Sequence, residues 1–153
     1  MVDYDILMPD KDYNVALDAL NEALGTIYAE SWAKDKQDTY GKPFNMNLAT
    51  FAQLWFDSAL KIFVAREDNK VVGFMVGMVF RPLPYDASVF QIEDWYSARG
   101  DVVRGLFDYA VQAIRFIGCD EIWIADRADR EPVIDSPVWK EHNRFLFRRY
   151  TRS

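Results

Sequence analysis

The residues that could support chemistry are concentrated in one segment, from Trp95 to Gly105. It reads Trp-Tyr-Ser-Ala-Arg-Gly-Asp-Val-Val-Arg-Gly and joins a predicted strand to a predicted helix. The first turn of a helix has N–H groups without partners inside the helix, and its dipole favours negative charge. With Arg99, Gly100 and Arg104 nearby, the segment has the residue types of a phosphate-binding site. An ordinary helix start has a similar composition, so both interpretations stay open.

The sequence lacks the residues that most other catalytic mechanisms require. His142 is the single histidine and Cys119 the single cysteine, and no Gly-x-Ser-x-Gly motif is present, which argues against a hydrolase with a nucleophile and a histidine base. The sequence contains no His-Glu-x-x-His motif, no P-loop and no dinucleotide fingerprint. A lone cysteine excludes an internal disulfide and a cysteine-cluster metal site. We therefore expect no metal, and we expect Cys119 to be a small buried residue just after a helix.

Composition and length predict one globular domain over residues 1–153. Half of the 153 residues are apolar and 27% are charged, as in typical folded domains. The longest apolar run, residues 71–80, is far shorter than the ~20 residues of a membrane helix, and the acidic start has no apolar signal region. We therefore expect a cytoplasmic protein that does not contact a membrane.

Charge is spread unevenly along the chain. The net charge is −6, which argues against a nucleic-acid partner. Residues 138–153 carry five basic residues and one acidic residue, a net charge of +4, which leaves −10 on the first 137 residues. This basic C-terminal segment is either a solvated surface or a contact for an acidic partner, and it suggests a homo-oligomer or a protein partner.

The hydrophobic pattern predicts strands and helices in a mixed order. Strands are expected over residues 4–8, 62–65, 71–80, 88–96 and 121–125, and helices over residues 13–32, 48–60 and 101–117. Asp12 or Asn14, Asn47 and Asp101 are the expected N-caps, and Gly118 the expected C-cap. Residues 34–42 and 126–135 are expected to be loops. Residues 137–149 fit a helix and also a strand, with the helix favoured.

Two of these strands have informative patterns. Residues 71–80 are apolar on both faces, which predicts a central strand, and Gly73 and Gly77 within it predict a bulge or a close backbone approach. In residues 88–96, simple alternation places Glu93 on one face and Asp94 on the other.

The order of elements and the Arg-Gly loop resemble the GNAT N-acetyltransferase superfamily over about residues 4–151. The resemblance implies an α/β (α+β) fold with a mixed, mostly antiparallel sheet of five to six strands flanked by three to four helices. In this family the fourth strand splays from the fifth, acetyl-CoA lies between them, and amides of the next loop hold the pyrophosphate. The implied cofactor-binding residues are Tyr96, Ser97, Arg99, Gly100, Asp101, Val102, Val103, Arg104, Gly105 and Asn143.

The resemblance also implies catalytic residues. Glu93 corresponds to a carboxylate that deprotonates the acceptor amine in this family. Asn143 and Tyr150 have the spacing of the family's Asn-x-x-Ala-x-x-x-Tyr helix, with Leu146 in the alanine position. The tyrosine of that motif protonates the departing thiolate, which assigns this role to Tyr150.

Two functions follow as expectations. The first is an N-acyltransferase that moves an acetyl group from acetyl-CoA to a primary amine of a small molecule or peptide. The alternative is a catalytically inactive GNAT-like binding or structural module, for example a phage virion or assembly component. It is motivated by the basic C-terminal segment and by Val102 and Arg104, which stand where the family has small residues. We expect a virion-associated location if this alternative holds.

Overall fold

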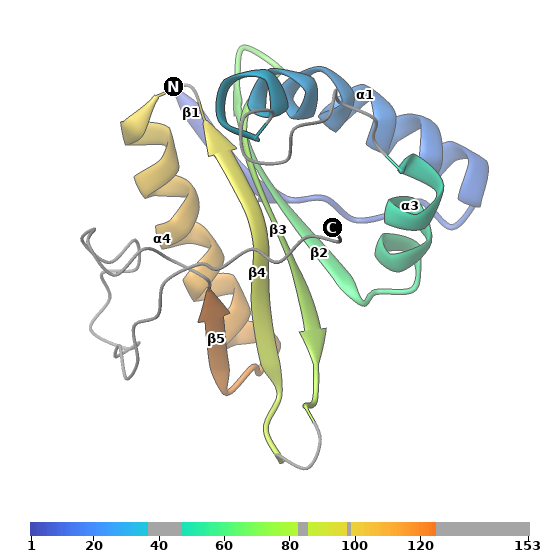
Figure 1. Ribbon diagram of the computed structural model, residues 1–153, viewed down its shortest axis with the longest axis vertical. Coiled ribbons are helices and arrows are strands. Elements are labelled where there is room, and N and C mark those ends of the chain that lie inside the picture. The colour runs from blue at the N-terminus through green and yellow to red at the C-terminus, as the bar shows by residue number, and fades with distance from the viewer. Residues whose placement is uncertain (37–46, 83–85, 98, 125–153) are drawn as a thin grey trace, which may run out of the picture.

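A five-stranded sheet runs through the part of the chain that the computed structural model describes, which is residues 1–36, 47–82, 86–97 and 99–124 (Figure 1). The strands are β1 (Val2–Ile6), β2 (Leu60–Glu67), β3 (Lys70–Phe80), β4 (Val89–Ser97) and β5 (Glu121–Ile124). They lie side by side in sequence order, with β1 to β4 antiparallel and β5 parallel to β4. The predicted α+β class with a mixed, mostly antiparallel sheet is confirmed.

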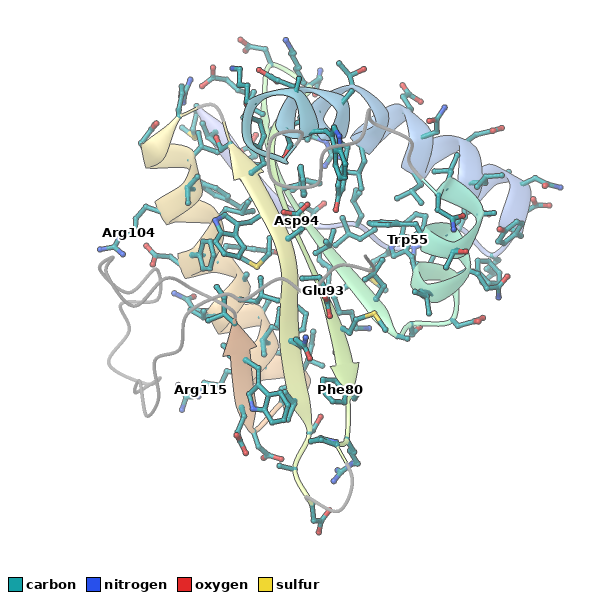
Figure 2. All side chains as sticks on the ribbon, viewed as in Figure 1. Trp55, Phe80, Glu93, Asp94, Arg104 and Arg115 are labelled. Carbon is teal, nitrogen blue, oxygen red and sulfur yellow. The ribbon has the colours of Figure 1, made fainter. Side chains whose placement is uncertain are left out.

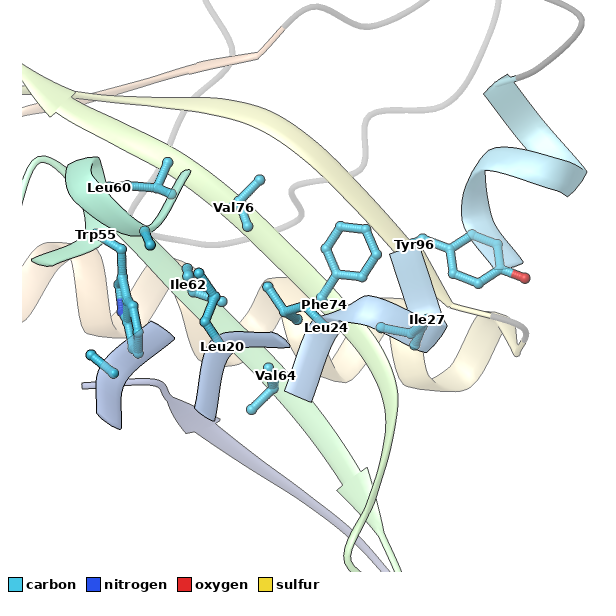
Figure 3. Close-up of a cluster of buried hydrophobic side chains, with 12 residues drawn as sticks. Leu20, Leu24, Ile27, Trp55, Leu60, Ile62, Val64, Phe74, Val76 and Tyr96 are labelled. Atoms are coloured by element: carbon cyan, nitrogen blue, oxygen red, sulfur yellow. The ribbon is translucent and has the colours of Figure 1, made fainter. Parts of the chain in front are cut away.

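Helices cover both faces of this sheet (Figure 1). Helix α1 (Tyr13–Ser31), which continues into the π-helical turn η1 (Trp32–Lys36), and helix α3 (Leu48–Phe56) lie on one face, and α4 (Gly100–Ile117) lies on the other. Alternate residues of each strand therefore enter two separate cores, as the two-residue period of a strand requires. On the first face, Leu20, Leu24 and Ile27 of α1 pack on the sheet (Figure 3).

The helix boundaries follow from their caps. Asp12 accepts hydrogen bonds from the N–H groups of Asn14 and Val15 at 2.9 and 3.2 Å, and Asn47 accepts from Thr50 at 3.3 Å. Gly118 ends α4 in the left-handed conformation at φ 101°. These caps were predicted. The predicted cap Asp101 is wrong, because the helix starts one residue earlier and Arg99 is its N-cap.

The polar residues 67–70 between two predicted strands indicate a hairpin turn, and β2 and β3 do form a hairpin, with a tighter turn. Asp68 and Asn69 form a two-residue turn with φ of 53° and 63°, the geometry that joins twisted antiparallel strands best. Strand β3 lies at the centre of the sheet, as predicted, and Phe74 and Met75 are fully buried on opposite faces.

Both glycines of β3 lie where the pairing shifts. Gly73 opposes Ala65, just before β2 shifts register against β3, and Gly77 opposes Ile92, where β4 shifts register. A Cβ at Gly77 would overlap the Phe90 ring and lie 2.7 Å from the Gln91 carbonyl oxygen. The predicted bulge and close approach are therefore both present.

Several boundaries differ from the prediction. Strand β1 covers Val2–Ile6, because its extent is set by pairing with β2 from Glu67 back to Phe63. Helix α3 ends at Phe56, and Leu60 pairs with Met78 as the first residue of β2. Residues 34–36 belong to η1, not to a loop. The remainder of that loop and residues 125–153 lie outside the described residues.

Two further findings concern the whole described part. Cys119 is buried in the core between the sheet and α4, as predicted. Within the described ranges, no helix has the length and apolarity needed to span a membrane.

Candidate functional site

Strand β4 has two halves with different neighbours. Residues 89–92 pair with β3 on one side and with residues 121–124 of β5 on the other. Residues 93–97 continue past the end of β5, and in the described part of the chain β3 is their only partner strand (Figure 1). The family resemblance predicts that β4 splays from β5 at this point, and this stays a prediction, because residues 125–153 lie outside the described residues.

A bulge brings the two carboxylates of β4 to the same face. Val76 of β3 opposes Asp94 and Gly77 opposes Ile92, so Glu93 is the extra residue between them. Ile92 packs in the core beneath α4, and the neighbouring alternation turns Glu93 to the other face.

Asp94 lies on that same face. Its partner Val76 belongs to the core beneath α1 and α3, while Trp95 returns to the α4 side. Glu93 and Asp94 are therefore neighbours on the face of α1 and α3 (Figure 2). The prediction that they point to opposite faces is wrong, because strict alternation does not hold across a bulge.

The two carboxylates differ in their surroundings. Partial burial raises the pKa of Glu93 above its ordinary value, although its side chain still reaches the surface. Asp94 accepts a hydrogen bond from the Trp95 N–H at 2.9 Å. A carboxylate with a raised pKa is a stronger base when it is ionised, so Glu93 is the better proton acceptor of the two.

The start of α4 follows directly on this half of β4. The Arg99 N–H donates to Ser97 Oγ at 3.1 Å, and the Val103 N–H donates to the Arg99 carbonyl at 3.3 Å. The N–H groups of Gly100, Asp101 and Val102 precede the first intrahelical bond, as at every helix start. These groups and the helix dipole make the turn suitable for an anion.

Arg99 is held by two carboxylates. Its guanidinium contacts both oxygens of Glu67 at 3.0 to 3.2 Å and both oxygens of Asp101 at 3.3 Å. Glu67 could not be predicted as a partner of Arg99, because the two residues lie 32 positions apart in the sequence and Glu67 is at the end of another strand.

Val102 is compatible with an open helix start. It is fully buried, and its side chain lies against Gly73, where a Cβ would be only 3.0 Å from Val102 Cγ1. Val102 stands where the family has a small residue, and its side chain points into the core. Val103 is half-buried on the α4 side of the sheet, and Gly105 lies against the Tyr4 ring.

Tyr96 and Arg104 lie in different environments. The Tyr96 ring is buried on the face of α1, 6.5 Å from the Phe74 ring centroid. The hydrogen bond that Lys34 donates to Glu30 at 3.1 Å raises the pKa of this lysine, and the nearby Tyr96 adds to the rise. Arg104 is exposed one turn into α4 (Figure 2). Asn143 and Tyr150 lie outside the described residues, and their roles stay predictions.

A groove of about 580 Å³ lies elsewhere, between α1 and the end of the β2–β3 hairpin. None of the predicted site residues is among its lining residues, which are Leu7, Met8, Ala19, Glu22, Ala23, Thr26, Ile27, Glu30, Trp55, Arg66, Asn69, Lys70 and Val71. Among the residues that the structure describes, no group of three His, Cys, Asp or Glu is placed to hold a metal ion.

Solved structures share this fold, whereas no family model and no curated protein matches the sequence. An aminoglycoside acetyltransferase, meta-AAC0020, from an uncultured soil metagenomic sample has a TM-score of 0.62 at 16% identity, covering 94% of this chain and 96% of that one. The "predicted acetyltransferase" of Clostridium acetobutylicum, solved with acetyl-CoA, has a TM-score of 0.58 at 16% identity and the same coverages. A transcriptional regulator from Bacillus halodurans C-125 has a TM-score of 0.59 at 18% identity, covering 84% and 85%.

The fold is therefore that of the GNAT acetyltransferases. Identities of 16–18% describe shared architecture, and a fold hosts more than one function. What this chain does has to be argued from its own residues.

Proposed function

We propose that the chain is an N-acyltransferase that transfers the acetyl group of acetyl-CoA to a primary amine. The observation that carries the proposal is the pairing of two features on residues 93–97 of β4 and the turn after it. A carboxylate with a raised pKa lies at one end of this half-strand, and an open helix N-terminus lies at the other. The shared fold with acetyltransferases, one of them solved with acetyl-CoA, supports the same reading.

The reaction assigns a proton role to Glu93. An amine attacks a thioester only as the neutral base, so its proton must be removed, directly or through water. As the new C–N bond forms and the C–S bond breaks, Glu93 would accept the amine proton and Tyr150 would give its proton to the leaving thiolate. Proton exchange with water would then return both residues to their starting states. The contribution of Tyr150 rests on the family resemblance alone.

The start of α4 is assigned to the CoA pyrophosphate. The N–H groups of Gly100, Asp101 and Val102 supply the donors, and the Val102 side chain is buried in the core and does not cover them. Arg104 supplies the nearby exposed positive charge. Ser97, Val103, Gly105 and Asn143 complete the proposed cofactor set, and Tyr96 contributes its backbone, because its ring is buried.

Titration calorimetry tests the cofactor site. We expect micromolar binding of acetyl-CoA and of CoA, weakened at least tenfold by Arg104→Glu, because a negative charge would then face the pyrophosphate. The matched control is Arg115→Glu, the same charge reversal at the far end of α4 (Figure 2), which should change the dissociation constant less than twofold. No binding at millimolar ligand, or equal effects of the two variants, would contradict the assignment.

Acetyl transfer to a panel of primary amines tests the base. Glu93→Gln should lower kcat/KM by about 10²-fold or more, the usual contribution of a general base. Asp94→Asn, the neighbouring carboxylate on the same face, is the matched control and should lower it less than tenfold. Equal losses in the two variants would remove Glu93 from this role.

The alternative function is a catalytically inactive module that binds a protein partner. It is favoured by one observation, that Glu67 and Asp101 already occupy the guanidinium of Arg99 at the helix start. Residues 138–153 would then contact an acidic partner or a second copy of the chain, as in a phage virion or assembly. Native mass spectrometry distinguishes the two functions, since a monomer that binds CoA and retains no partner contradicts the alternative.

A further inference from the structure

We propose that Glu67 is a positioning residue for the start of α4, and that Arg99 is the link through which it acts and not a phosphate ligand. Glu67, at the end of β2, holds the Arg99 guanidinium and so fixes the turn whose N–H groups are assigned to the pyrophosphate. The effect on CoA rests on the proposed function. The effect on the turn itself does not.

All three nitrogens of the Arg99 guanidinium are engaged by carboxylates in this arrangement. Nη1 contacts both oxygens of Glu67, Nη2 contacts one oxygen each of Glu67 and Asp101, and Nε contacts the other oxygen of Asp101. A phosphate at Arg99 would have to compete with these two carboxylates. The arginine that the family resemblance assigned to the cofactor is thus engaged within the protein.

Three segments meet at this point. The hairpin end supplies Glu67, the end of β4 supplies Ser97 Oγ, which accepts from the Arg99 N–H, and the helix supplies Asp101. Beneath them, Val102 lies against Gly73 of β3. The Arg99 side chain therefore connects three segments on the outer side of the turn. On its inner side, the turn is held by the packing of Val102 in the core.

The size of the interaction decides how it must be measured. Arg99 and Glu67 are partly exposed, with side-chain exposures of 45% and 32%. Exposed ion pairs contribute little to global stability. A role in positioning should therefore appear in the local order of the turn and in ligand affinity, not in the unfolding midpoint.

The test is a charge swap. Arg99→Glu should speed amide hydrogen exchange at residue 99 and at Val103, whose N–H groups donate to Ser97 Oγ and to the residue 99 carbonyl, at least tenfold in the ligand-free protein, and should weaken CoA binding at least tenfold. The double variant Glu67→Arg, Arg99→Glu rebuilds the ion pair in reverse. We expect it to restore both exchange and the CoA dissociation constant to within threefold of wild type.

The outcomes separate positioning from ligation. If the swap restores exchange but CoA binding stays as weak as in Arg99→Glu, Arg99 contacts the phosphate and the proposal is overturned. If Arg99→Glu leaves exchange unchanged, no positioning occurs and the proposal is also overturned. Arg66→Gln is the control: its guanidinium lies 4.0 Å from Asp5, and it should change neither quantity.

The failure of the proposed function would look different. If the wild-type protein shows no CoA binding, the exchange measurements still decide whether Glu67 orders the turn, because they need no ligand. Restored exchange in the swap would then support the positioning role in a protein that is not a CoA-dependent enzyme.

Discussion

The two halves of β4 belong to one strand and have opposite characters. Residues 89–92 are paired on both edges and place Val89, Phe90 and Ile92 in the core, each at most 5% exposed. Residues 93–97 begin with a bulge, lose the β5 partner in the described part of the chain, and carry two adjacent carboxylates. The first half is dominated by packing, and the second holds the polar groups of the candidate site.

The boundary between the halves is the contact of Gly77 with the strand opposite it. Only glycine lets the β3 backbone come this close to Phe90 and Gln91, and the extra residue of the bulge, Glu93, follows directly. A packing requirement in one half thus sets the direction of the carboxylates in the other.

Phe90→Ala should have the largest effect. Phe90 is 1% exposed and meets the Phe63 ring edge-on at 6.0 Å, so truncation leaves a cavity in the α4-side core. We expect a loss of about 3–5 kcal/mol in the free energy of unfolding, measured by denaturant titration. Phe90→Leu keeps most of the volume and gives a measurable value if the alanine variant does not fold. Gln91 is the next residue and lies on the opposite face. The unfolding free energy of Gln91→Ala should stay within about 0.5 kcal/mol of the wild-type value. A small loss of unfolding free energy in Phe90→Ala would show that residues 89–92 contribute little to the packing of the core.

Gly77→Ala tests the boundary between the two halves of β4. The new Cβ overlaps the Phe90 ring and approaches the Gln91 carbonyl oxygen, which is backbone and cannot rotate away. We expect a loss of at least about 2 kcal/mol in unfolding free energy. Gly25→Ala in α1 is the control, because its nearest neighbour is the exposed Asn21 side chain and helical alanine should stabilise by about 0.5–1 kcal/mol. Equal effects at the two glycines would argue against a tight β3–β4 contact.

Gly73→Ala probes the far end of the second half. Its Cβ would lie 3.0 Å from Val102 Cγ1 and 3.3 Å from Ser97 Cβ, contacts that require a shift of a few tenths of an ångström. We expect a cost of about 1 kcal/mol. In a Val102→Ala background the crowding methyl is gone, so the same change should cost less than half as much. A double-mutant cycle measures this coupling, and strict additivity would mean that the two residues do not constrain each other.

Much of the architecture was predictable because it depends on local signals. Caps at Asp12 and Asn47, the left-handed Gly118 and the turn residues Asp68 and Asn69 act within a few positions of themselves. The central place of β3 followed from its apolar residues on both faces. These features need no knowledge of which segments become neighbours.

The parts that failed depend on partners distant in sequence. Leu60 continues the apolar stripe of α3, but it pairs with Met78 and so begins a strand. Asp94 lies on the other face than predicted because a bulge forms opposite Gly77 of β3. The alternation of residues within β4 alone does not reveal this bulge, because it depends on the neighbouring strand. Arginine is a residue type that commonly contacts phosphates, yet the Arg99 guanidinium forms an ion pair with Glu67 of another strand. Local sequence predicted the candidate site, and nonlocal pairing determined which partners its side chains have in the fold.

The smallest predicted effect concerns the charge of Glu93 in the second half of β4. Burial raises the pKa of Glu93 above its ordinary 4.5, so the folded protein holds this proton more tightly than the unfolded chain does. Stability is therefore lost as the pH rises from 4.5 through the raised pKa, and it stays lowered above that window. Glu93→Gln cannot ionise and should be slightly more stable than wild type at pH 7, with the difference vanishing below pH 4.5. Denaturant titrations at the two pH values measure it, and Gln91→Ala, which removes no titrating group, should differ from wild type equally at both. An advantage of Glu93→Gln that grows as the pH falls would contradict burial as the cause and would place a stabilising partner beside the carboxylate.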